Sequence, residues 1–448
     1  MKRTACYNNH FAKFIRAIAG LSVFACTSML PATETFDKFV FAHYMVALPT
    51  AGPASTVDDY KAEIQAAQKA GIDGFALNCG AWSVKEPHYK ERVLKLYEAA
   101  RDLNTGFKLF ISADFTTELS FDEFKDMVEV FRNHPNQFKH EGKPVLSTFR
   151  GEQMNLTDLV KKEFVDKKEI VLVPFYYPNP PTELPNDDEI KTLLESNSDL
   201  PGFFYFGAAG TPSEISSVSR RTAAAWLGSG KIYMAPVTPY YLGYGVNNRV
   251  FESRGFEGMA EQWKAAIESK ATWIEITTWN DFSESSYVAP FGLPFKGNVW
   301  RGDWGNVLNH SAYLDASKYF IKWFKRGKPP TIKRDELFYF YRLHPKSLAG
   351  KEGMPRNAAS MKDEIFVTVF LKAPARLTIE NGKAVTAFEL DSGVNHVSVP
   401  LSIGTPRFIL SRDNKTLINK VGELAIDVEN TWGNHNYFTG SAVLSPKN

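Results

Sequence analysis

The sequence predicts an α/β protein, a (β/α)8 barrel of the TIM type followed by a C-terminal antiparallel β-sandwich. From Phe39 to about residue 325, short apolar runs alternate with longer amphipathic ones, a pattern typical of strand–helix units. Eight apolar runs occur in this region, which is the number of strands in such a barrel. After Lys328-Pro329-Pro330 the runs become short, β-rich and separated by turn residues, which indicates a sandwich.

The expected barrel strands are apolar runs that cover, in order, residues 39–46, 75–78, 108–114, 144–149, 170–177, 203–206, 232–237 and 273–279. Apolar side chains at helical spacing predict helices from Asp58 or Asp59 to about Ala70, and then over 87–103, 121–132, 156–167, 214–227, 257–268 and 310–325. The fifth strand is apolar almost throughout, as expected for a strand buried on both faces. A doubly wound open sheet is the alternative, but no G-x-G-x-x-G motif follows the first strand.

The C-terminal region contains turn signals such as Asn381-Gly382 and Ser392-Gly393. The expected strands cover residues 338–343, 364–371, 375–379, 384–390, 396–401, 407–410 and 424–428. We therefore expect a signal peptide or N-terminal extension over 1–35, a catalytic barrel over 36–330 and an accessory β-sandwich over 331–448.

Composition and short motifs exclude several classes of protein. Among the 448 residues, 52 Lys and Arg balance 50 Asp and Glu, and no basic stripe points to nucleic acid. The chain has three cysteines, no C-x-x-C or H-E-x-x-H motif and no Walker-type loop, so neither a metal nor another cofactor is expected. No G-x-S-x-G elbow indicates a serine hydrolase. The 34 Phe, 18 Tyr and 9 Trp either fill the core or line a binding groove.

The N-terminus resembles a secretory leader. Four basic residues in the first 16 positions precede the uncharged run Ala17–Leu30, which is too short to span a bilayer but fits the apolar part of a signal. We expect a secreted or cell-wall protein with no membrane contact after processing. The alternative is an intracellular protein with an N-terminal extension. Triplets at Asn155, Asn309 and Asn414 would accept glycans only on the secretory route.

Polar residues follow the expected strands at the end where a barrel of this kind carries its active site. The candidates for substrate binding or chemistry are His43, Asn78, Asp114, Tyr176, Tyr177, Tyr240, Trp279, Asn280, Asp281 and Glu284. A single Asp or Asn after a strand more often caps a turn or a helix. The recurrence of such residues at successive strand ends favours chemistry over capping.

Asp281 and Glu284 are the densest acidic feature. Two carboxyls three residues apart can face one cavity, one kept protonated by apolar surroundings and the other ionised, and acetal hydrolysis requires that division. Asp114 is a candidate third member. The alternative is that Asp281 caps a turn and Glu284 is solvated. The aromatic residues of the same rim are candidates either for stacking on sugar rings or for lids over the core. Glu275, within an apolar strand, is interpreted as a paired interior carboxylate.

The segment W-I-E-I-T-T-W-N-D-F-S-E-S-S-Y-V-A-P (273–290) and the segments 39–46, 70–78, 143–152 and 233–239 resemble glycoside hydrolase family 71, the fungal endo-1,3-α-glucanases or mutanases. The resemblance implies an inverting endo-hydrolase of fungal-wall α-1,3-glucan. It places the catalytic carboxylates at Asp281 and Glu284 and a further acidic site residue at Asp114. We favour Glu284 as the acid and Asp281 as the base. Ala113 and Phe282-Ser283 depart from the expected pattern, which concerns the subsites rather than the carboxylates.

We therefore expect a monomeric enzyme whose partner is α-1,3-glucan polysaccharide. Two other functions stay open: a catalytically inactive wall-glucan-binding protein, and a barrel glycosidase acting on another α-linked glycan. The three intact carboxylates argue against the first of these. The biological role stays open among cell separation, spore release and attack on a foreign wall.

Overall fold

The structure is a computed structural model that describes residues 38–152, 155–290, 299–302, 305–349, 353–428 and 435–444. The leader expected over 1–35 lies outside these residues. Residues Asp37–Asn448 form one compact unit. Within the described ranges, no helix is both long and apolar enough to cross a membrane.

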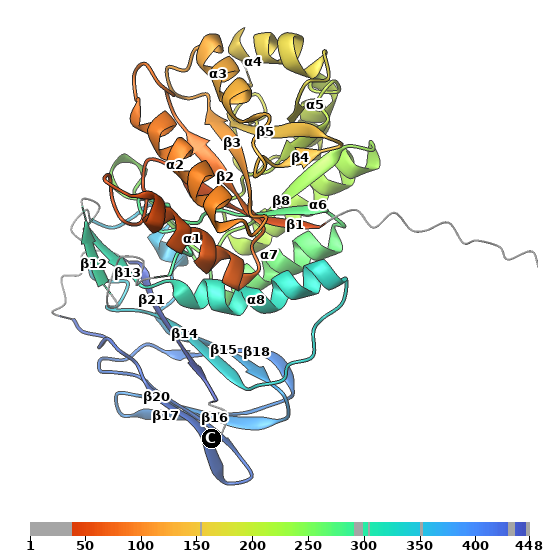
Figure 1. Ribbon diagram of the computed structural model, residues 1–448. Helices are drawn as coiled ribbons and strands as arrows, with labels where there is room; N and C mark the ends of the chain where they lie inside the picture. Colours follow the sequence, from red (N-terminus) through yellow and green to blue (C-terminus); the bar gives the residue numbers. More distant parts are fainter. Residues whose placement is uncertain are drawn as a thin grey trace, which may run out of the picture. The chain divides into compact units, whose positions relative to one another are not determined.

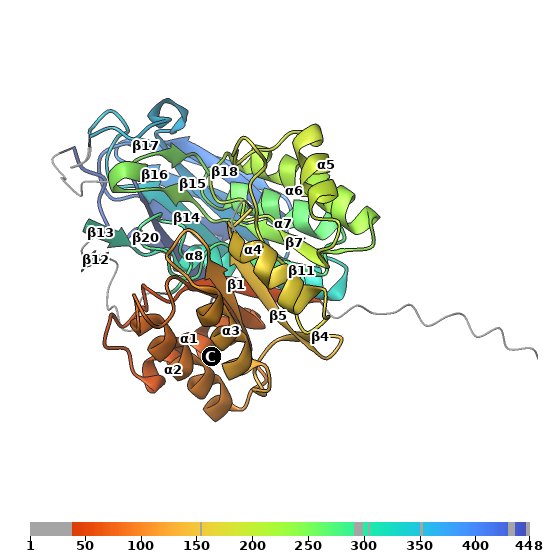
Figure 2. The same cartoon turned by 90° about the horizontal axis from the view of Figure 1, so that it is seen from above.

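The N-terminal part is a mixed α/β structure built on one curled sheet (Figures 1 and 2). Its parallel strands lie in the spatial order β6, β5, β3, β2, β1, β11, β8, β7, and β4 pairs antiparallel with β5. The strands are β1 (Phe39–Met45), β2 (Gly74–Cys79), β3 (Lys108–Asp114), β4 (Lys139–His140), β5 (Lys143–Phe149), β6 (Val171–Leu172), β7 (Gly202–Phe204), β8 (Ile232–Val237) and β11 (Trp273–Ile276). All eight strands expected from the sequence are therefore present.

The two ends of this strand order meet at β6 and β7. The expected fifth strand, 170–177, pairs with β5 at Val171–Leu172 and again at a single bridge between Phe175 and Phe149. On the side towards β7, Pro174 has no N–H to donate. Its carbonyl oxygen instead accepts a hydrogen bond from the Phe204 N–H (2.8 Å). Among the described residues, this backbone bond joins the two end strands in place of a ladder.

Helices cover the outer side of the curled sheet (Figure 2). They are α1 (Val57–Ala70), α2 (His88–Leu103), α3 (Phe121–Phe131), α4 (Asn155–Val160) with its π-helical continuation η1 (Lys161–Val165), α5 (Asp187–Ser196), α6 (Pro212–Gly228), α7 (Phe256–Glu268) and α8 (Ser311–Arg326). Helices α1, α3, α5 and α6 each begin at a capping box, which satisfies free N–H groups of the first turn. Helix α5 has no counterpart in the sequence-based expectation, because only Ile190 and Leu193 are buried along it.

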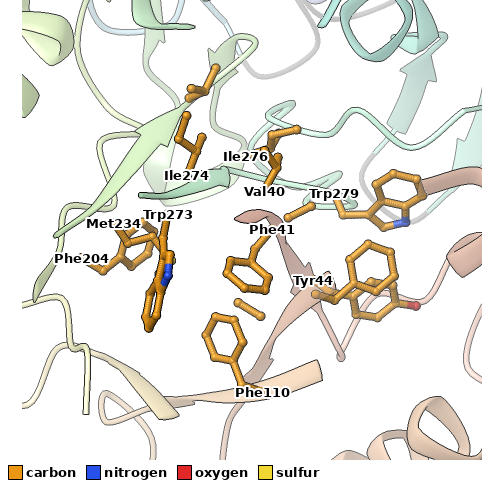
Figure 3. Close-up of a cluster of buried hydrophobic side chains, with 14 of the residues drawn as sticks. Val40, Phe41, Tyr44, Phe110, Phe204, Met234, Trp273, Ile274, Ile276 and Trp279 are labelled. Atoms are coloured by element: carbon orange, nitrogen blue, oxygen red, sulfur yellow. The ribbon is translucent and has the colours of Figure 1, made fainter. Parts of the chain in front are cut away.

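The inside of the curled sheet is packed with large side chains. Phe41 meets Phe110 edge-on, with 5.0 Å between ring centres, and Trp273 packs beside Phe41 (Figure 3). Side chains alternate between the two faces of a strand, so Tyr44 lies on the outer face, near Trp279 in the same view. Much of the aromatic excess therefore belongs to the core.

The C-terminal part is all-β, apart from the short 3-10 turn η3 (Ala358–Ser360). One antiparallel sheet has the order β18, β15, β14, β21, and the other has the order β17, β16, β19, β20. The strands are β14 (Glu336–Arg342), β15 (Glu364–Leu371), β16 (Ala375–Asn381), β17 (Ala384–Leu390), β18 (Gly393–Pro400), β19 (Arg407–Arg412), β20 (Lys415–Val421) and β21 (Tyr437–Val443). Side chains of both sheets, such as Tyr339 and Phe408, share one apolar core.

The expected closing strand over 424–428 is wrong. Those residues form a single bridge, between Ile426 and Gly404, and β21 pairs with β14 instead. Strand β21 escaped prediction because its Thr439, Gly440 and Ser441 weaken the apolar pattern. Gly440 is required there, since a Cβ atom would meet the hydroxyl oxygen of Tyr339 at 2.3 Å and its ring at 2.4 Å.

Two short hairpins lie outside the main sheets. Strands β9 (Tyr241–Leu242) and β10 (Val250–Phe251) pair antiparallel around the 3-10 turn η2 (Gly245–Asn247). Strands β12 (Val299–Gly302) and β13 (Gly305–Leu308) form a second hairpin. The β9–β10 hairpin follows β8 and, as described next, supplies side chains to the candidate site.

Candidate active site

The segment after β11 brings two acidic side chains close together through a tight turn. The Asp281 N–H donates to Thr278 Oγ1 (2.8 Å). Asp281 Oδ1 accepts hydrogen bonds from Ser283 Oγ (2.6 Å) and from the backbone N–H of Glu284 (3.0 Å). Asp281 therefore does cap a turn, but with one oxygen only. The hydrogen bonds described for this carboxyl fall on Oδ1, which leaves Oδ2 as the candidate oxygen for chemistry.

Glu284 is held by the β9–β10 hairpin. Its Oε1 accepts hydrogen bonds from Tyr241 OH (2.7 Å) and from Asn247 Nδ2 (3.0 Å). Arg249 stacks over the Tyr241 ring, 5.2 Å from its centre, and forms a two-pronged ion pair with Glu183 (2.7 and 3.0 Å). The side chain is therefore fixed rather than solvated, and Oε2 is the oxygen left without a partner within the described ranges.

Glu284 lines a pocket of about 70 Å³. The other lining residues are Phe149, Phe175, Tyr177, Glu183, Tyr205, Phe206, Gly207, Ala208, Ala209, Tyr241 and Arg249. A second hollow shares Tyr177, Glu183 and Ala209 with the first and continues to Arg150 and Phe251. Aromatic rings and paired charged side chains line both hollows. Such a surface suits a sugar ring, whose C–H faces stack on aromatic rings and whose hydroxyls bind polar groups.

The two carboxyls differ in their electrostatic surroundings. Burial, and then the nearby charge of Asp281, raise the pKa of Glu284 to about 8, against the weaker opposing effects of Tyr241 and Arg249. Burial also raises the pKa of Asp281, but hydrogen bonds from Ser283 and from the Glu284 backbone favour its ionised form. Near neutral pH, Glu284 therefore carries a proton and Asp281 is the better candidate for a base.

Asp114 and His43 are the further acidic and histidine candidates, and of the two only His43 is fully buried. Asp114, at the end of β3, accepts hydrogen bonds on Oδ1 from the Thr116 N–H (2.9 Å) and Oγ1 (2.6 Å). Burial raises its pKa, while Thr116 and the charge of His43 lower it. His43 Nδ1 and Glu275 Oε1 are 2.6 Å apart. Glu275 is thus a paired interior carboxylate, as its position in an apolar strand indicates.

Two polar atoms of the His43–Glu275 pair remain without a partner in the described part of the chain, namely His43 Nε2 and Glu275 Oε2, and both are buried. The His43 ring lies 5.1 Å from that of Phe206, which lines the pocket. The buried pair therefore packs directly against a residue that lines the pocket.

The remaining candidates for substrate binding divide into two groups. Tyr177 lines the pocket, with the Arg150 guanidinium 4.7 Å from its ring centre. Asn78, the last residue but one of β2, lies between Met45 and Ser112 of the adjacent strands. The others are buried in structural contacts away from the pocket. They are Tyr176 against the helix layer, Tyr240 bonded to the His435 carbonyl, Trp279 bonded to Glu63, and Asn280 bonded to the backbone of Met45 and Leu48.

Sequence reasoning did not identify four side chains that surround Glu284. Tyr241 was recognisable only as one of several rim aromatics, and Asn247, Arg249 and Glu183 carried no signal. Asn247 and Arg249 lie in a hairpin that resembles an ordinary polar loop, and Glu183 comes from the distant segment before α5. Among the described residues, no group of three His, Cys, Asp or Glu side chains could hold a metal ion.

A mixed α/β sheet that carries a protonated carboxyl and a second carboxyl at its strand ends has the groups that a glycoside hydrolase requires. The sequence profile of glycosyl hydrolase family 71 matches residues 36–447, and the chain belongs to this family. It is therefore a glycoside hydrolase, as its sequence indicates.

Characterised relatives span nearly the whole chain. A glucan endo-1,3-alpha-glucosidase of Schizosaccharomyces pombe is 32% identical, over 90% of this chain and 94% of its own length. A mutanase of Penicillium rubens is 28% identical, over 91% and 90%. An ascus wall endo-1,3-alpha-glucanase of S. pombe is 25% identical, over 87% and 93%.

Among solved structures, a GH99 endo-alpha-mannosidase from Bacteroides thetaiotaomicron aligns with a TM-score of 0.50 and 18% identity, covering 65% of this chain and 99% of that one. At this identity the likeness concerns the fold alone.

Proposed function

We propose that this protein is an endo-hydrolase of the α-1,3-glucosidic bonds of fungal cell-wall α-glucan. The observation that carries the proposal is the arrangement of Asp281 and Glu284, each with one oxygen held by the protein and the other left as the candidate oxygen for chemistry. The names of the relatives supply the substrate class, since they include a mutanase and two α-1,3-glucan hydrolases. The continuation of the pocket past Tyr177 suits a polymer rather than a single sugar.

In the proposed mechanism Glu284 donates the proton on Oε2 to the leaving glycosidic oxygen. Asp281 Oδ2 removes a proton from a water that attacks the anomeric carbon on the opposite face, and the configuration inverts. Asp114 is the third acidic residue of the proposed site. Tyr177 contributes to it from the pocket wall, and Asn78 and His43 contribute as buried polar groups of β2 and β1. No cofactor is needed for this chemistry.

The proposal also covers the domain architecture, the location and the oligomeric state of the protein. We infer that the curled sheet is a closed (β/α)8 barrel over 36–330, supported by its strand order and the Phe204–Pro174 bond. The two C-terminal sheets with their shared core support a β-sandwich over 331–448. Secretion to the wall after removal of a leader within 1–35, and a monomeric state, complete the proposal.

The test is release of reducing sugar from insoluble α-1,3-glucan by Asp281→Asn and Glu284→Gln, each folded as judged by its thermal transition. Activity should fall at least ~1,000-fold in both, because each variant loses one of the two required proton transfers. Asp391→Asn and Glu195→Gln are matched controls, since both carboxylates are exposed and neither lines the pocket; these variants should keep wild-type rates.

The alternatives are separate outcomes of the same experiment. Binding of the wild-type protein to glucan without product would support a wall-binding protein. Turnover only of another α-linked glycan would support a different glycosidase. Inversion is tested by NMR of the first product, which should be the β-anomer.

A further inference from the structure

The donors and acceptors of the hydrogen bonds around Glu284 can be assigned one by one, starting from Arg249. Arg249 has only donors, and its Nη2 donates to Glu183 Oε1 (2.7 Å) and to the Tyr241 hydroxyl oxygen (3.4 Å). Asn247 Nδ2 also donates to the Tyr241 oxygen. The Tyr241 oxygen is therefore occupied as an acceptor, and its single proton is directed to Glu284 Oε1.

This direction determines which oxygen of Glu284 carries the acid proton. Oε1 accepts from both Tyr241 and Asn247, and an oxygen that accepts two hydrogen bonds is the carbonyl oxygen of a neutral carboxylic acid. The proton therefore lies on Oε2. When the proton leaves, Tyr241 and Asn247 donate to a full carboxylate, and such charge-assisted bonds are about twice as strong as neutral ones.

We propose that Tyr241 is a positioning residue for Glu284, which orients the acid proton on Oε2 and stabilises the carboxylate that forms when the proton is transferred. The Arg249–Glu183 ion pair holds Tyr241 in this orientation from the segment before α5. The inference rests on the proposed role of Glu284 as the acid and adds to it a residue with no proton transfer of its own.

Several charged and titratable groups act on Glu284 from the neighbouring segments. Asp281 in its own turn and Glu183 before α5 favour the protonated form, while Arg249 and the Tyr241 hydroxyl favour the ionised form. Tyr241 itself stays neutral, since burial and then the Glu284 charge hold its pKa well above the usual value. Removal of the hydroxyl takes away a donor to the carboxylate, so the pKa of Glu284 should rise.

The test is Tyr241→Phe, which keeps the ring and removes only the hydroxyl. With soluble α-1,3-glucan oligosaccharides, kcat should fall by roughly 10- to 100-fold, as expected for a hydrogen bond to a charged group. KM should change little, and the alkaline limb of the pH profile should move to higher pH. An aryl glycoside whose phenol leaves without protonation should recover most of the lost rate.

Tyr97→Phe is the matched control, because that buried hydroxyl also donates to a side-chain oxygen at 2.7 Å, in Gln137, but belongs to the helix layer. Tyr97→Phe should lower the melting temperature about as much as Tyr241→Phe does, but it should leave the alkaline limb of the pH profile unchanged. If Tyr241 served only as a sugar platform, Tyr241→Phe would keep its rate and its alkaline limb, and the proposal would be overturned.

An infrared titration tests the role of Tyr241 independently of whether the proposed substrate is correct. The carboxyl band of Glu284, identified by its loss in Glu284→Gln, is followed against pH without any glycan. A higher pKa in Tyr241→Phe supports the positioning role even if α-1,3-glucan is not cleaved. An unchanged pKa together with an unchanged kcat on any accepted glycan rejects it.

Discussion

At the residue scale, Asp281 and Glu284 show how two carboxyls three positions apart acquire different chemistry. Asp281 receives a backbone N–H and a serine hydroxyl on one oxygen, and both donors favour the anion. Glu284 is partly buried in the wall of the pocket, beside that anion, and both effects favour retention of its proton. The distinction comes from the turn and the hairpin around the two carboxyls.

The pH dependence of the reaction follows from these surroundings. Glu284 must be protonated to act as the acid, so kcat/KM should fall as pH rises above about 8. Asp281 must be ionised, and because burial raises its pKa, the acid limb should lie above the ordinary range of an aspartate. Steady-state rates on soluble oligosaccharides from pH 4 to about pH 10 measure both limbs. If residual activity of Glu284→Gln kept the same alkaline limb, that limb would belong to another group.

At the element scale, Trp279 connects three elements rather than presenting a face to sugar. Its Nε1 donates to Glu63 Oε2 (2.8 Å) on α1, and Tyr44 on β1 donates to the other oxygen of the same carboxyl (2.9 Å). The indole packs against Phe75 of β2, with ring centres 5.2 Å apart. The segment that carries Asp281 and Glu284 is thereby fastened to the outer face of the sheet.

Trp279→Phe should therefore weaken the fold rather than substrate binding. The variant keeps an aromatic ring but leaves a buried carboxyl oxygen without its donor, which costs about 1–3 kcal/mol. Denaturant unfolding measures this loss, and KM for soluble glucan oligosaccharides should stay near the wild-type value. Trp226→Phe is the control, because the buried Nε1 of Trp226 has no partner among the described residues. A large rise in KM for Trp279→Phe with unchanged stability would restore the sugar-platform interpretation.

At the scale of the whole molecule, a buried ion pair joins the all-β part to the segment that carries the β9–β10 hairpin. Arg342 of β14 donates to Glu252 Oε2 (2.9 Å) and to the His435 carbonyl (2.9 Å), and Tyr437 of β21 donates to Glu252 Oε1. Burial opposes ionisation of Glu252, but the Arg342 charge and these donors hold its pKa below the usual value. Its contribution to stability is therefore present above the pKa of the unfolded chain and is lost as pH falls through the folded value.

Arg342→Met should leave Glu252 as an unpaired buried charge and destabilise the protein by about 3–5 kcal/mol. Differential scanning calorimetry should show a lower melting temperature, and the second change Glu252→Gln should recover part of it by removing the charge. If the β-rich part were energetically independent, Arg342→Met would leave the main transition unmoved.

The sequence predicted repeating local features well and contacts between distant segments poorly. Helices α2 and α7 and strands β8, β15 and β17 lie within a residue of their expected limits, because apolar period and turn residues determine such elements locally. Helix α5 and strands β20 and β21 were missed because their sequences are largely polar or small. The candidate carboxyls came from one contiguous motif. The partners of Glu284 could not be found, because Tyr241, Arg249 and Glu183 meet only through the fold.

By itself, the sequence determined the family, the alternation of strands and helices and the identity of the acidic residues, since each of these is written in neighbouring residues. The tertiary structure decided which aromatic residues face the pocket, with Tyr177 and Tyr241 at its wall and Trp279 and Tyr240 in structural contacts. It also decided which carboxyl keeps its proton. Both depend on burial and on charges brought together from distant segments, which no local pattern encodes.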